Sequence, residues 1–299
     1  MRITVFTPTY NRAYIIEQLY KSLQNQSFYD FEWLVIDDGS TDNTKNLFEQ
    51  WVQEHNNFEI RYYQFDNVGK QREINRALDL AEGELFFTVD SDDLLTADAL
   101  EKIDKWEKAL PHNNNYCGFA GSDGDMKGKP TNPLFDQPYI DATFFNRYPE
   151  SGLFIGHDRP WVFYTSIHRE FKYPEFEGEK FITESVVWNR MAAAGYKIRC
   201  YNDVIYLWEH QDDGLTNEIQ KKIVSNPKGY GLWVAEKSKY LKLTFAQRMK
   251  AYYAFTIDMD QYSSSDIADF VEIPWIVIAL CKSLHYLRKK KLGGRKTNI

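Results

Sequence analysis

The sequence predicts an α/β fold with a mainly parallel central sheet flanked by helices, followed by a helical C-terminal extension. Short apolar runs alternate with helical patterns through the first hundred residues, and each run ends at a proline or a polar residue. This alternation is typical of a parallel sheet with crossover helices. We expect one domain over 1–214, with halves 1–110 and 111–214, and a helical region over 215–299.

The expected elements follow in chain order. The apolar run at 3–7 predicts the first buried strand, and apolar residues at helical spacing from Ile15 to Leu23 predict a helix over 12–26. The first half continues with strands at 31–37, 60–65 and 84–90 and helices at 46–55, 70–83 and 95–110. The second half is loop-rich, with a strand at 116–123, a helix at 183–195 and a strand-rich stretch at 196–210.

Composition narrows the class of protein. The 299 residues are 43% apolar, enough for a substantial core, and the net charge is −7. No acidic residue follows Glu272, whereas seven basic residues do, so the preceding part carries about −14. Such an acidic body argues against nucleic acid as the partner. Three widely spaced cysteines give no disulfide framework or zinc spacing, and no signal peptide is recognisable, so we expect a cytoplasmic setting.

Three motifs stand at the ends of predicted strands. They are TPTYNR (7–12), VIDDGSTDNT (35–44) and VDSDD (89–93). Each alone is also explained by a turn, a helix cap or a solvated loop. In a parallel sheet, however, ligands gather at the carboxyl ends of the strands. Pro8, Asp38 and Asp90 are therefore expected to converge in one crevice.

Together these motifs resemble those of the family 2 glycosyltransferases, inverting enzymes of the nucleotide-sugar-binding GT-A fold. The resemblance is strong over residues 1–95 and weaker over 175–216. It implies transfer of a sugar from a nucleotide diphosphate-sugar to an acceptor hydroxyl. It also implies a setting in bacterial surface-polysaccharide synthesis.

The resemblance assigns the donor site. Residues matching Pro8 and Tyr10 flank the base, and the one matching Asp38 accepts a hydrogen bond from the uracil imide, which favours a UDP-sugar. Arg12 and Lys70 complete the expected nucleotide-sugar contacts. A cationic contact that many relatives make is missing, because Ile74 stands where they carry Arg.

A divalent cation is expected at the carboxylate cluster. In the family's D-x-D motif, matched by Asp90-Ser91-Asp92, the first carboxylate faces the ribose and the last reaches the metal. Asp93 either binds the metal or orients its neighbours, and His210 in HQDDGLT (210–216) is a further ligand candidate. Mn²⁺ or Mg²⁺ suits such hard oxygen ligands and would neutralise charge on the departing UDP.

The base that activates the acceptor must come from later in the chain. In FITESVVWNRM (181–191), Glu184 falls on the family's base position, although Thr183 and Glu184 replace the usual Glu-Asp pair. At a helix N-terminus near a metal, Glu184 is expected to be ionised and ready to accept a proton. The rival carboxylates are Glu175, Glu177 and Glu179.

Asp158, Arg159 and Trp161 are expected at the acceptor sugar. Trp161 either stacks on a sugar ring or packs in the core.

The tail combines an apolar segment at 273–287 with a basic segment at 288–296. That combination suits an anionic membrane surface, and a core-packed helix with a solvated end is the other reading. Membrane contact would place the protein peripherally on the inner face of the cell membrane, beside a lipid-linked saccharide acceptor.

Two alternatives remain open. A sugar-1-phosphate nucleotidyltransferase shares the sheet type and the metal, but would need a Gly-rich loop that TPTYNR lacks. A non-catalytic glycan- or nucleotide-binding protein would not need the carboxylate cluster.

Overall fold

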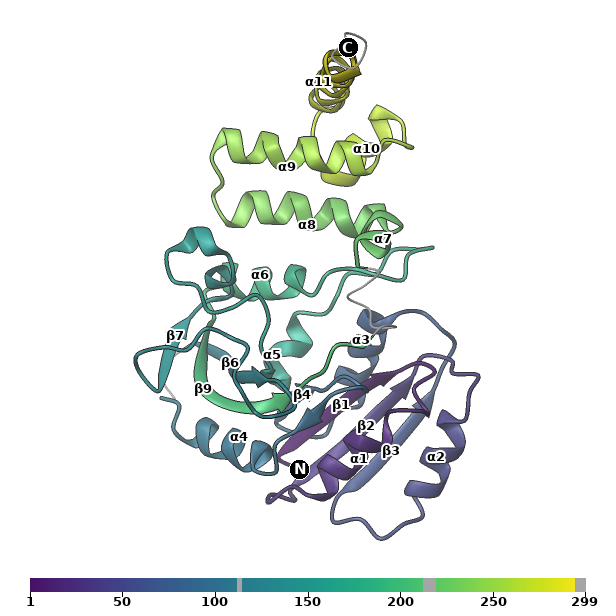
Figure 1. Cartoon of the computed structure of the whole chain (residues 1–299), viewed down its shortest axis with the longest axis vertical. Coiled ribbons are helices and arrows are strands. Elements are labelled where there is room, and N and C mark those ends of the chain that lie inside the picture. Colours follow the sequence, from purple (N-terminus) through teal and green to yellow (C-terminus); the bar gives the residue numbers. More distant parts are fainter. Residues whose placement is uncertain (112–114, 212–218, 294–299) are drawn as a thin grey trace, which may run out of the picture. The chain divides into compact units, whose positions relative to one another are not determined.

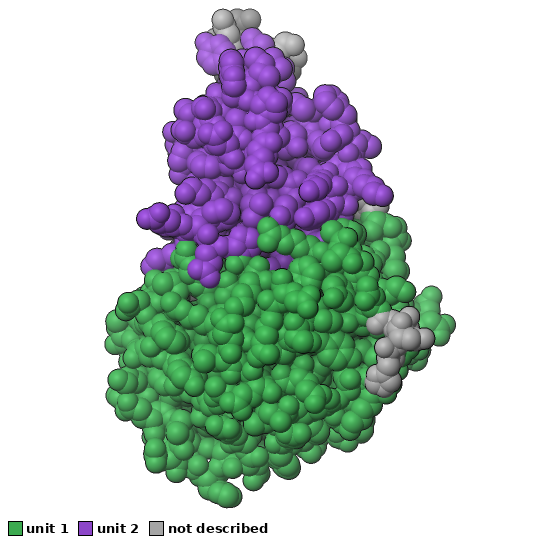
Figure 2. All heavy atoms as spheres, turned by 180° about the vertical axis from the view of Figure 1, so that it is seen from behind, with its two compact units in different colours: residues 1–173, 190–214 green, residues 174–189, 215–299 purple. Residues whose placement is uncertain are grey.

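The computed structural model describes residues 1–111, 115–211 and 219–293 (Figure 1). Contacts divide the chain into two compact units, coloured in Figure 2. Unit 1 consists of residues 1–173 and 190–214, and unit 2 of residues 174–189 and 215–299. Residues 174–189, which were expected within the first domain, thus group with the C-terminal helices.

Unit 1 contains a nine-stranded sheet whose order is β3-β2-β1-β4-β8-β6-β9-β5, with β7 paired to β9. The strands are β1 (Ile3–Thr9), β2 (Phe31–Asp37), β3 (Glu59–Gln64), β4 (Leu85–Thr88), β5 (Leu94–Leu95), β6 (Tyr116–Gly124), β7 (Tyr139–Ala142), β8 (Trp161–Tyr164) and β9 (Lys197–Leu207). Pairing directions make β1, β2, β3, β4, β6 and β9 mutually parallel, whereas β5, β7 and β8 run the opposite way. The predicted mainly parallel α/β fold is confirmed.

Helices cover this sheet and its connections. They are α1 (Glu17–Gln24), α2 (Thr44–Trp51), α3 (Lys70–Leu80), α4 (Ala99–Lys108) and α5 (Thr165–Glu170), with 3₁₀ turns at Phe144–Arg147 and Pro149–Ser151. Helix α1 begins five residues later than predicted, because Asn11 takes a left-handed conformation (φ 53°) and the residues after it form a turn. Strands β7 and β8 lie in a part of the chain for which the sequence predicted no element.

Strand β1 continues through Pro8 to Thr9, two residues beyond its predicted end. The Phe6 carbonyl accepts from the Val89 N–H, so Phe6 and Pro8 both present their main-chain groups toward β4. Strand β4 ends at Thr88, opposite Phe6. The missing N–H of Pro8 therefore removes no ladder hydrogen bond, and β1 reaches the sheet edge intact.

The core of unit 1 is rich in aromatic rings. Trp33 is fully buried between the rings of Tyr20, Phe48 and Trp51, and its indole N–H donates to Thr7 Oγ1 (3.0 Å). Burial of such rings contributes most of the stabilisation that fixes the sheet. The polar loops at the sheet edge therefore extend from well-packed strands.

Unit 2 is helical. Helix α6 (Ser185–Ala193) begins in it, and α7 (Ile219–Val224), α8 (Pro227–Tyr240), α9 (Phe245–Asp258), α10 (Ser264–Val271) and α11 (Trp275–Gly293) belong to it (Figure 1). Helices α8 and α10 pack closely at Gly231, where a Cβ would lie 2.1 Å from the Phe270 carbonyl oxygen. The helical C-terminal region is confirmed.

Helix α11 has two apolar faces. Ile278 belongs to the apolar core of unit 2, and Cys281 is also buried. A second set of residues, spaced by four, four and three positions, is more than half exposed: Ile276, Leu280, Leu284 and Leu287. No helix within the described ranges is long and apolar enough to span a membrane.

Candidate active site

The site edge of unit 1 is formed by the carboxyl ends of the parallel strands. Strands β3, β2, β1 and β4 are neighbours and end at Gln64, Asp37, Thr9 and Thr88 (Figure 1). The three sequence motifs therefore emerge side by side, as predicted. Loops at such an edge are a usual place for ligand binding.

Hydrogen bonds join the first motif to the second. Asn11 N–H donates to Ser40 Oγ (2.7 Å), and Thr41 N–H donates to Asn11 Oδ1 (2.8 Å). Ala13 N–H donates to Asp42 Oδ2 (2.9 Å). Asparagine tolerates the left-handed conformation at position 11 better than most residues. Much of the TPTYNR and DDGSTD pattern thus shapes the loops.

The two aspartates of DDGS have different roles. Asp37 is fully buried and accepts from Ser40 N–H (2.7 Å). The Asp38 carboxylate reaches the next loop and accepts from the N–H groups of Val68 (2.6 Å) and Gly69 (3.0 Å). Hydrogen bonds to a carboxylate contribute about 1.5–3 kcal/mol each. Asp38 therefore anchors the segment that carries Lys70.

The turn after Asp38 requires glycine. Gly39 has φ +83°, and a Cβ there would lie 3.1 Å from the main-chain nitrogen of Asn67. A side chain would be strained by the left-handed conformation and would crowd the 65–67 loop.

Two cationic side chains reach the carboxylate cluster from neighbouring loops. Lys70 Nζ lies 2.8 Å from Asp90 Oδ1, and the Arg12 guanidinium lies 3.7 Å from Asp92 Oδ2. The structure therefore brings four predicted donor-site residues together.

The third carboxylate, Asp93, is held by a residue that sequence reasoning missed. Tyr206 of β9 donates its hydroxyl to Asp93 Oδ2 (2.7 Å) and accepts from Asp90 N–H (3.1 Å). Nothing in the sequence near position 206 signals this role, because the contact depends on the pairing of β5 with β9. Tyr206 thus positions both ends of the cluster.

The cluster has a deficit of positive charge. Burial and the charge of Asp90 raise the pKa of Asp92, and Arg12 opposes that change. Burial and Asp90 raise the pKa of Asp93 to about 8. Carboxylates that resist ionisation in this way are a favourable environment for a bound cation.

The donor set fits a hard divalent cation. Asp90 and Asp92 offer oxygen ligands, and extra positive charge would relieve their mutual repulsion. No group of three or more His, Cys, Asp or Glu residues in the described ranges is already arranged around one metal position. His210 is exposed beyond the end of β9, and residues 212–216 of its loop lie outside the described residues.

The residues predicted to flank the base stand at the same edge. Pro8 is the second-last residue of strand β1, and the Tyr10 side chain is 49% exposed. An exposed aromatic ring beside polar loops is suited to stacking on a nucleobase. Ser91, within the D-S-D motif, is 6% exposed.

Glu184 lies directly before α6, in unit 2. Its carbonyl accepts from Trp188 N–H (3.3 Å), so it occupies the helix N-terminus as predicted. Glu179, one of the rival carboxylates, is 8% exposed and accepts from the N–H groups of Lys228 and Gly229 (2.8 and 2.9 Å). Glu179 therefore caps α8, whereas Glu175 and Glu177 are exposed.

The residues predicted at the acceptor are placed mostly in the scaffold. Arg159 is 3% exposed and donates to the carbonyls of Ile155, Gly121, Tyr201 and Pro133. Trp161 is 6% exposed and donates to Asp158 Oδ1 (2.8 Å). Burial leaves neither Arg159 nor Trp161 a face for a sugar, so both support β8 and β6, and only Asp158 is exposed.

The fold and this polar edge define the GT-A class of nucleotide-sugar-binding proteins. The sequence profile described as glycosyl transferase family 2 matches residues 4–171, more than half of the chain. The protein belongs to glycosyl transferase family 2.

Curated relatives match part of the chain. The GalNAc(5)-diNAcBac-PP-undecaprenol beta-1,3-glucosyltransferase of Campylobacter jejuni is 34% identical over 123 residues, covering 40% of this chain and 38% of the relative. The poly(ribitol-phosphate) beta-N-acetylglucosaminyltransferase TarS of Staphylococcus aureus is 36% identical over 103 residues, covering 34% and 18%. This chain therefore matches well under half the length of either relative.

Solved structures share the fold over most of the chain. Staphylococcus aureus TarS 1-349 in complex with UDP-GlcNAc has a TM-score of 0.59 at 19% identity, covering 87% of this chain and 82% of that one. The Pyrobaculum calidifontis mannosyltransferase PcManGT in complex with GDP-Man and Mn²⁺ has a TM-score of 0.56 at 20% identity, covering 96% and 80%. Both likenesses confirm the predicted GT-A fold.

Proposed function

We propose that the protein is an inverting glycosyltransferase that moves a sugar from a UDP-sugar to a hydroxyl of a saccharide acceptor. The observation that carries this proposal is the set of contacts between loops at the site edge. Asp38 accepts a hydrogen bond from the segment that carries Lys70, Lys70 pairs with Asp90, and Arg12 pairs with Asp92. A nucleotide diphosphate-sugar needs a base pocket next to a charged diphosphate site. At this edge the exposed Tyr10 ring supports the base site, and the cations and carboxylates support the diphosphate site.

Base recognition falls to Tyr10 and Asp38. The Tyr10 ring stacks on the base, and Asp38 accepts from the imide N–H of uracil. Each oxygen of a carboxylate has more than one acceptor position, so Asp38 can bind uracil while it retains its bonds to Val68 and Gly69. A cytosine base offers an acceptor at that position and is disfavoured.

The transfer is one displacement with Glu184 as general base. The acceptor hydroxyl gives its proton to the Glu184 carboxylate, and its oxygen bonds to the anomeric carbon. The bond from that carbon to the UDP oxygen breaks, and UDP keeps the electron pair. Attack opposite the leaving group inverts the anomeric configuration. Mn²⁺ or Mg²⁺ held by Asp90 and Asp92, with Asp93 and His210 as further candidate ligands, would neutralise charge on the diphosphate.

The biological setting is bacterial cell-surface glycan synthesis on the inner face of the cell membrane. The names of the Campylobacter and Staphylococcus relatives refer to an undecaprenol-linked saccharide and to poly(ribitol-phosphate). We place the acceptor among such lipid-linked or surface saccharides.

The exposed stripe of α11 supports docking on that membrane. Ile276, Leu280, Leu284 and Leu287 present apolar side chains, and Arg288 and Lys289 are exposed next to them. Apolar side chains beside basic ones bind anionic lipid surfaces. The enzyme would thereby be held where a lipid-linked acceptor resides.

A donor-binding and hydrolysis assay tests the enzymatic proposal. UDP with Mn²⁺ should raise the melting temperature more than CDP or GDP with Mn²⁺, because ligand binding stabilises the folded state. UDP-sugar hydrolysis should disappear in Asp92→Ala and Glu184→Ala. Hydrolysis that survives both substitutions would exclude the proposal, and a stabilised but inert wild type would favour a binding protein.

Vesicle sedimentation tests the membrane proposal. The protein should sediment with phosphatidylglycerol vesicles and less with phosphatidylcholine vesicles, and added salt should weaken the binding. The double substitution Leu280→Glu and Leu284→Glu should abolish it, whereas Leu134→Glu, at a residue 59% exposed in unit 1, should not. If the double variant instead converts a dimer to a monomer, the stripe joins two copies of the chain and the proposal fails.

A further inference from the structure

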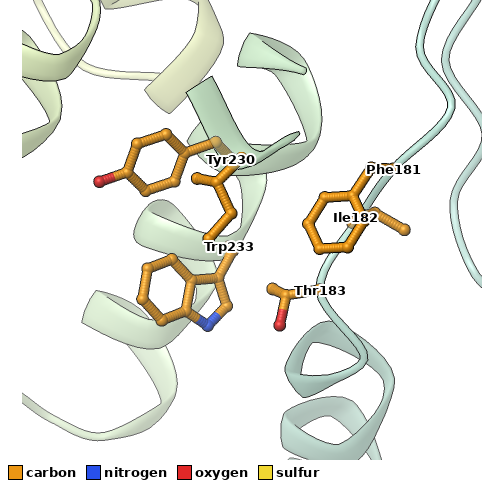
Figure 3. A pocket seen from close by; sticks show the side chains of 6 residues that line it. Phe181, Ile182, Thr183, Tyr230 and Trp233 are labelled. Atoms are coloured by element: carbon orange, nitrogen blue, oxygen red, sulfur yellow. The ribbon is translucent and has the colours of Figure 1, made fainter. Parts of the chain in front are cut away.

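A small apolar pocket lies in unit 2, next in sequence to Glu184. Its volume is about 40 Å³, and its walls come from the segment before α6 and from α7 and α8 (Figure 3). It is lined by Phe181, Ile182, Thr183, Ile223, Tyr230 and Trp233. This volume holds a few non-hydrogen atoms, so neither a sugar ring nor an acyl chain fits inside.

Hydrogen bonds hold the walls of the pocket in place. The Asn226 side chain accepts from the N–H groups of Lys180 (2.8 Å) and Phe181 (3.2 Å). Glu179 binds the first turn of α8, and Tyr230 donates its hydroxyl to Asp258 Oδ2 (2.8 Å). The pocket is therefore preformed, which favours binding of a small rigid group.

One polar group in the pocket lacks a partner. The indole Nε1 of Trp233 is buried and makes no hydrogen bond with any described residue. Figure 3 shows the Trp233 ring and Thr183 among the side chains around the pocket. A buried donor without an acceptor is costly and calls for an explanation. A trapped water does not explain the unpartnered N–H well, because a water needs two to four polar partners and these walls are mostly carbon.

We propose that the pocket receives the acetamido group of a 2-acetamido sugar in the acceptor. The acetyl methyl lies among the carbon walls, and the acetyl carbonyl accepts a hydrogen bond from Trp233 Nε1. Methyl and carbonyl together match the size, the apolar lining and the unpartnered Trp233 N–H.

The position in the chain links this pocket to the acceptor rather than to the donor. Thr183, in the pocket wall, is bonded directly to Glu184, and consecutive Cα atoms are about 3.8 Å apart. The assignment of the sugar to the acceptor rests on the proposed role of Glu184 as the base. An acetamido group held here would set which sugar presents its hydroxyl to that carboxylate.

Ligand-observed NMR titrations of the full chain test the proposal with two probes. These are methyl 2-acetamido-2-deoxy-β-glucopyranoside and methyl β-glucopyranoside, which differ only in the acetamido group. We expect the acetamido glycoside to bind about tenfold more tightly, since it buries a methyl and forms one hydrogen bond. Saturation transferred from the protein should be strongest at its acetyl methyl protons.

Variants separate the pocket from general effects. Trp233→Phe keeps the apolar wall and removes the N–H, so it should weaken the acetamido glycoside about fivefold and leave the other glycoside unchanged. Ile223→Phe should fill the pocket and abolish the preference. Trp275→Phe makes the same change at a residue that is 60% exposed and should alter neither affinity.

Equal affinity of the two glycosides for the wild type would overturn the proposal. So would a Trp233→Phe variant that weakens both glycosides alike, because that result indicates a purely structural role. UDP-sugar hydrolysis, measured on the same preparations, reports separately on the proposed function. A retained acetamido preference without hydrolysis would support the pocket and reject the enzyme.

Discussion

The site edge of unit 1 and the pocket of unit 2 use polar groups in opposite ways. At the edge, carboxylates and cations from four loops are drawn together, and even the main-chain N–H groups of Val68 and Gly69 are engaged by Asp38. In unit 2, Glu179 and Asn226 accept hydrogen bonds from main-chain N–H groups, and the Trp233 N–H in the pocket has no partner among the described residues. Under our proposals, the edge would bind a charged nucleotide-sugar through its charged side chains, and the pocket would recognise an acceptor sugar by shape. The predictions below test that division.

The largest effect is expected at the edge. Asp92→Asn keeps the shape of the side chain and removes its charge, so transfer should slow about a thousandfold through loss of electrostatic stabilisation. Steady-state kinetics with Mn²⁺ measures this. Asp98→Asn, at the start of α4, is the matched control and should behave as wild type. A near-normal Asp92→Asn enzyme would mean that charge at this edge is dispensable.

A smaller kinetic effect with a different signature is expected for Glu184→Gln. Loss of a general base should lower kcat about a hundredfold, while the KM for the donor stays unchanged. Glu177→Gln, at an exposed residue of the same unit, is the control. A raised donor KM with normal kcat would move Glu184 from acceptor activation to donor binding.

Alanine substitutions at one glycine in each unit allow the stabilities of the two units to be compared. Gly231→Ala places a Cβ against the Phe270 carbonyl, so it should destabilise unit 2 by about 2 kcal/mol. Gly39→Ala should cost unit 1 about 1 kcal/mol and also weaken UDP binding. Hydrogen exchange resolves the two units. Loss of UDP binding in Gly231→Ala alone would show that the edge depends on unit 2.

The smallest effect concerns pH. His168 is buried against the rings of Phe86, Phe163 and Tyr173, and this burial lowers its pKa to about 4. The folded-state pKa lies below the unfolded value of about 6.5, so the unfolded state gains the proton first and stability falls as pH drops from 6.5 toward 4. Between pH 7 and 5.5 the loss should be about 1 kcal/mol.

Urea unfolding of wild type and His168→Phe at the two pH values checks this expectation. The variant should lose that part of the pH dependence, whereas His55→Phe, at an exposed histidine, should keep it. Identical pH profiles for wild type and His168→Phe would rule out burial of a neutral histidine as the cause.

The same division explains what could be predicted from sequence. Strands β1, β2, β3 and β4 are local segments with their polar residues at the ends, so the sequence placed the three motifs at the correct strand ends. The hydrogen bonds by which Asn11 and Asp38 connect these loops could not be predicted, because residue types alone do not distinguish a ligand contact from a hydrogen bond between loops.

In the second half of unit 1, pairing between strands distant in the sequence limited what could be predicted. Strand β8 inserts between β4 and β6, and no local pattern indicates that neighbour. Arg159 and Trp161, predicted at the acceptor, are buried by that insertion. Tyr206 reaches Asp93 only because β9 returns beside β5. The pocket at Trp233 depends equally on helices distant in the chain.

Asp38 holds the 68–69 segment and is also proposed to bind the base, which matters for any attempt to change the nucleotide-sugar donor. The carboxylate assigned to uracil is also the fastening of the segment that delivers Lys70 to Asp90. Under the proposed function, base preference and diphosphate binding would therefore depend on the same carboxylate, and replacing Asp38 to accept another base would also loosen the segment that holds Lys70 beside Asp90. An altered donor preference is better sought at Tyr10, whose exposed ring carries no such second duty among the contacts seen in the described chain.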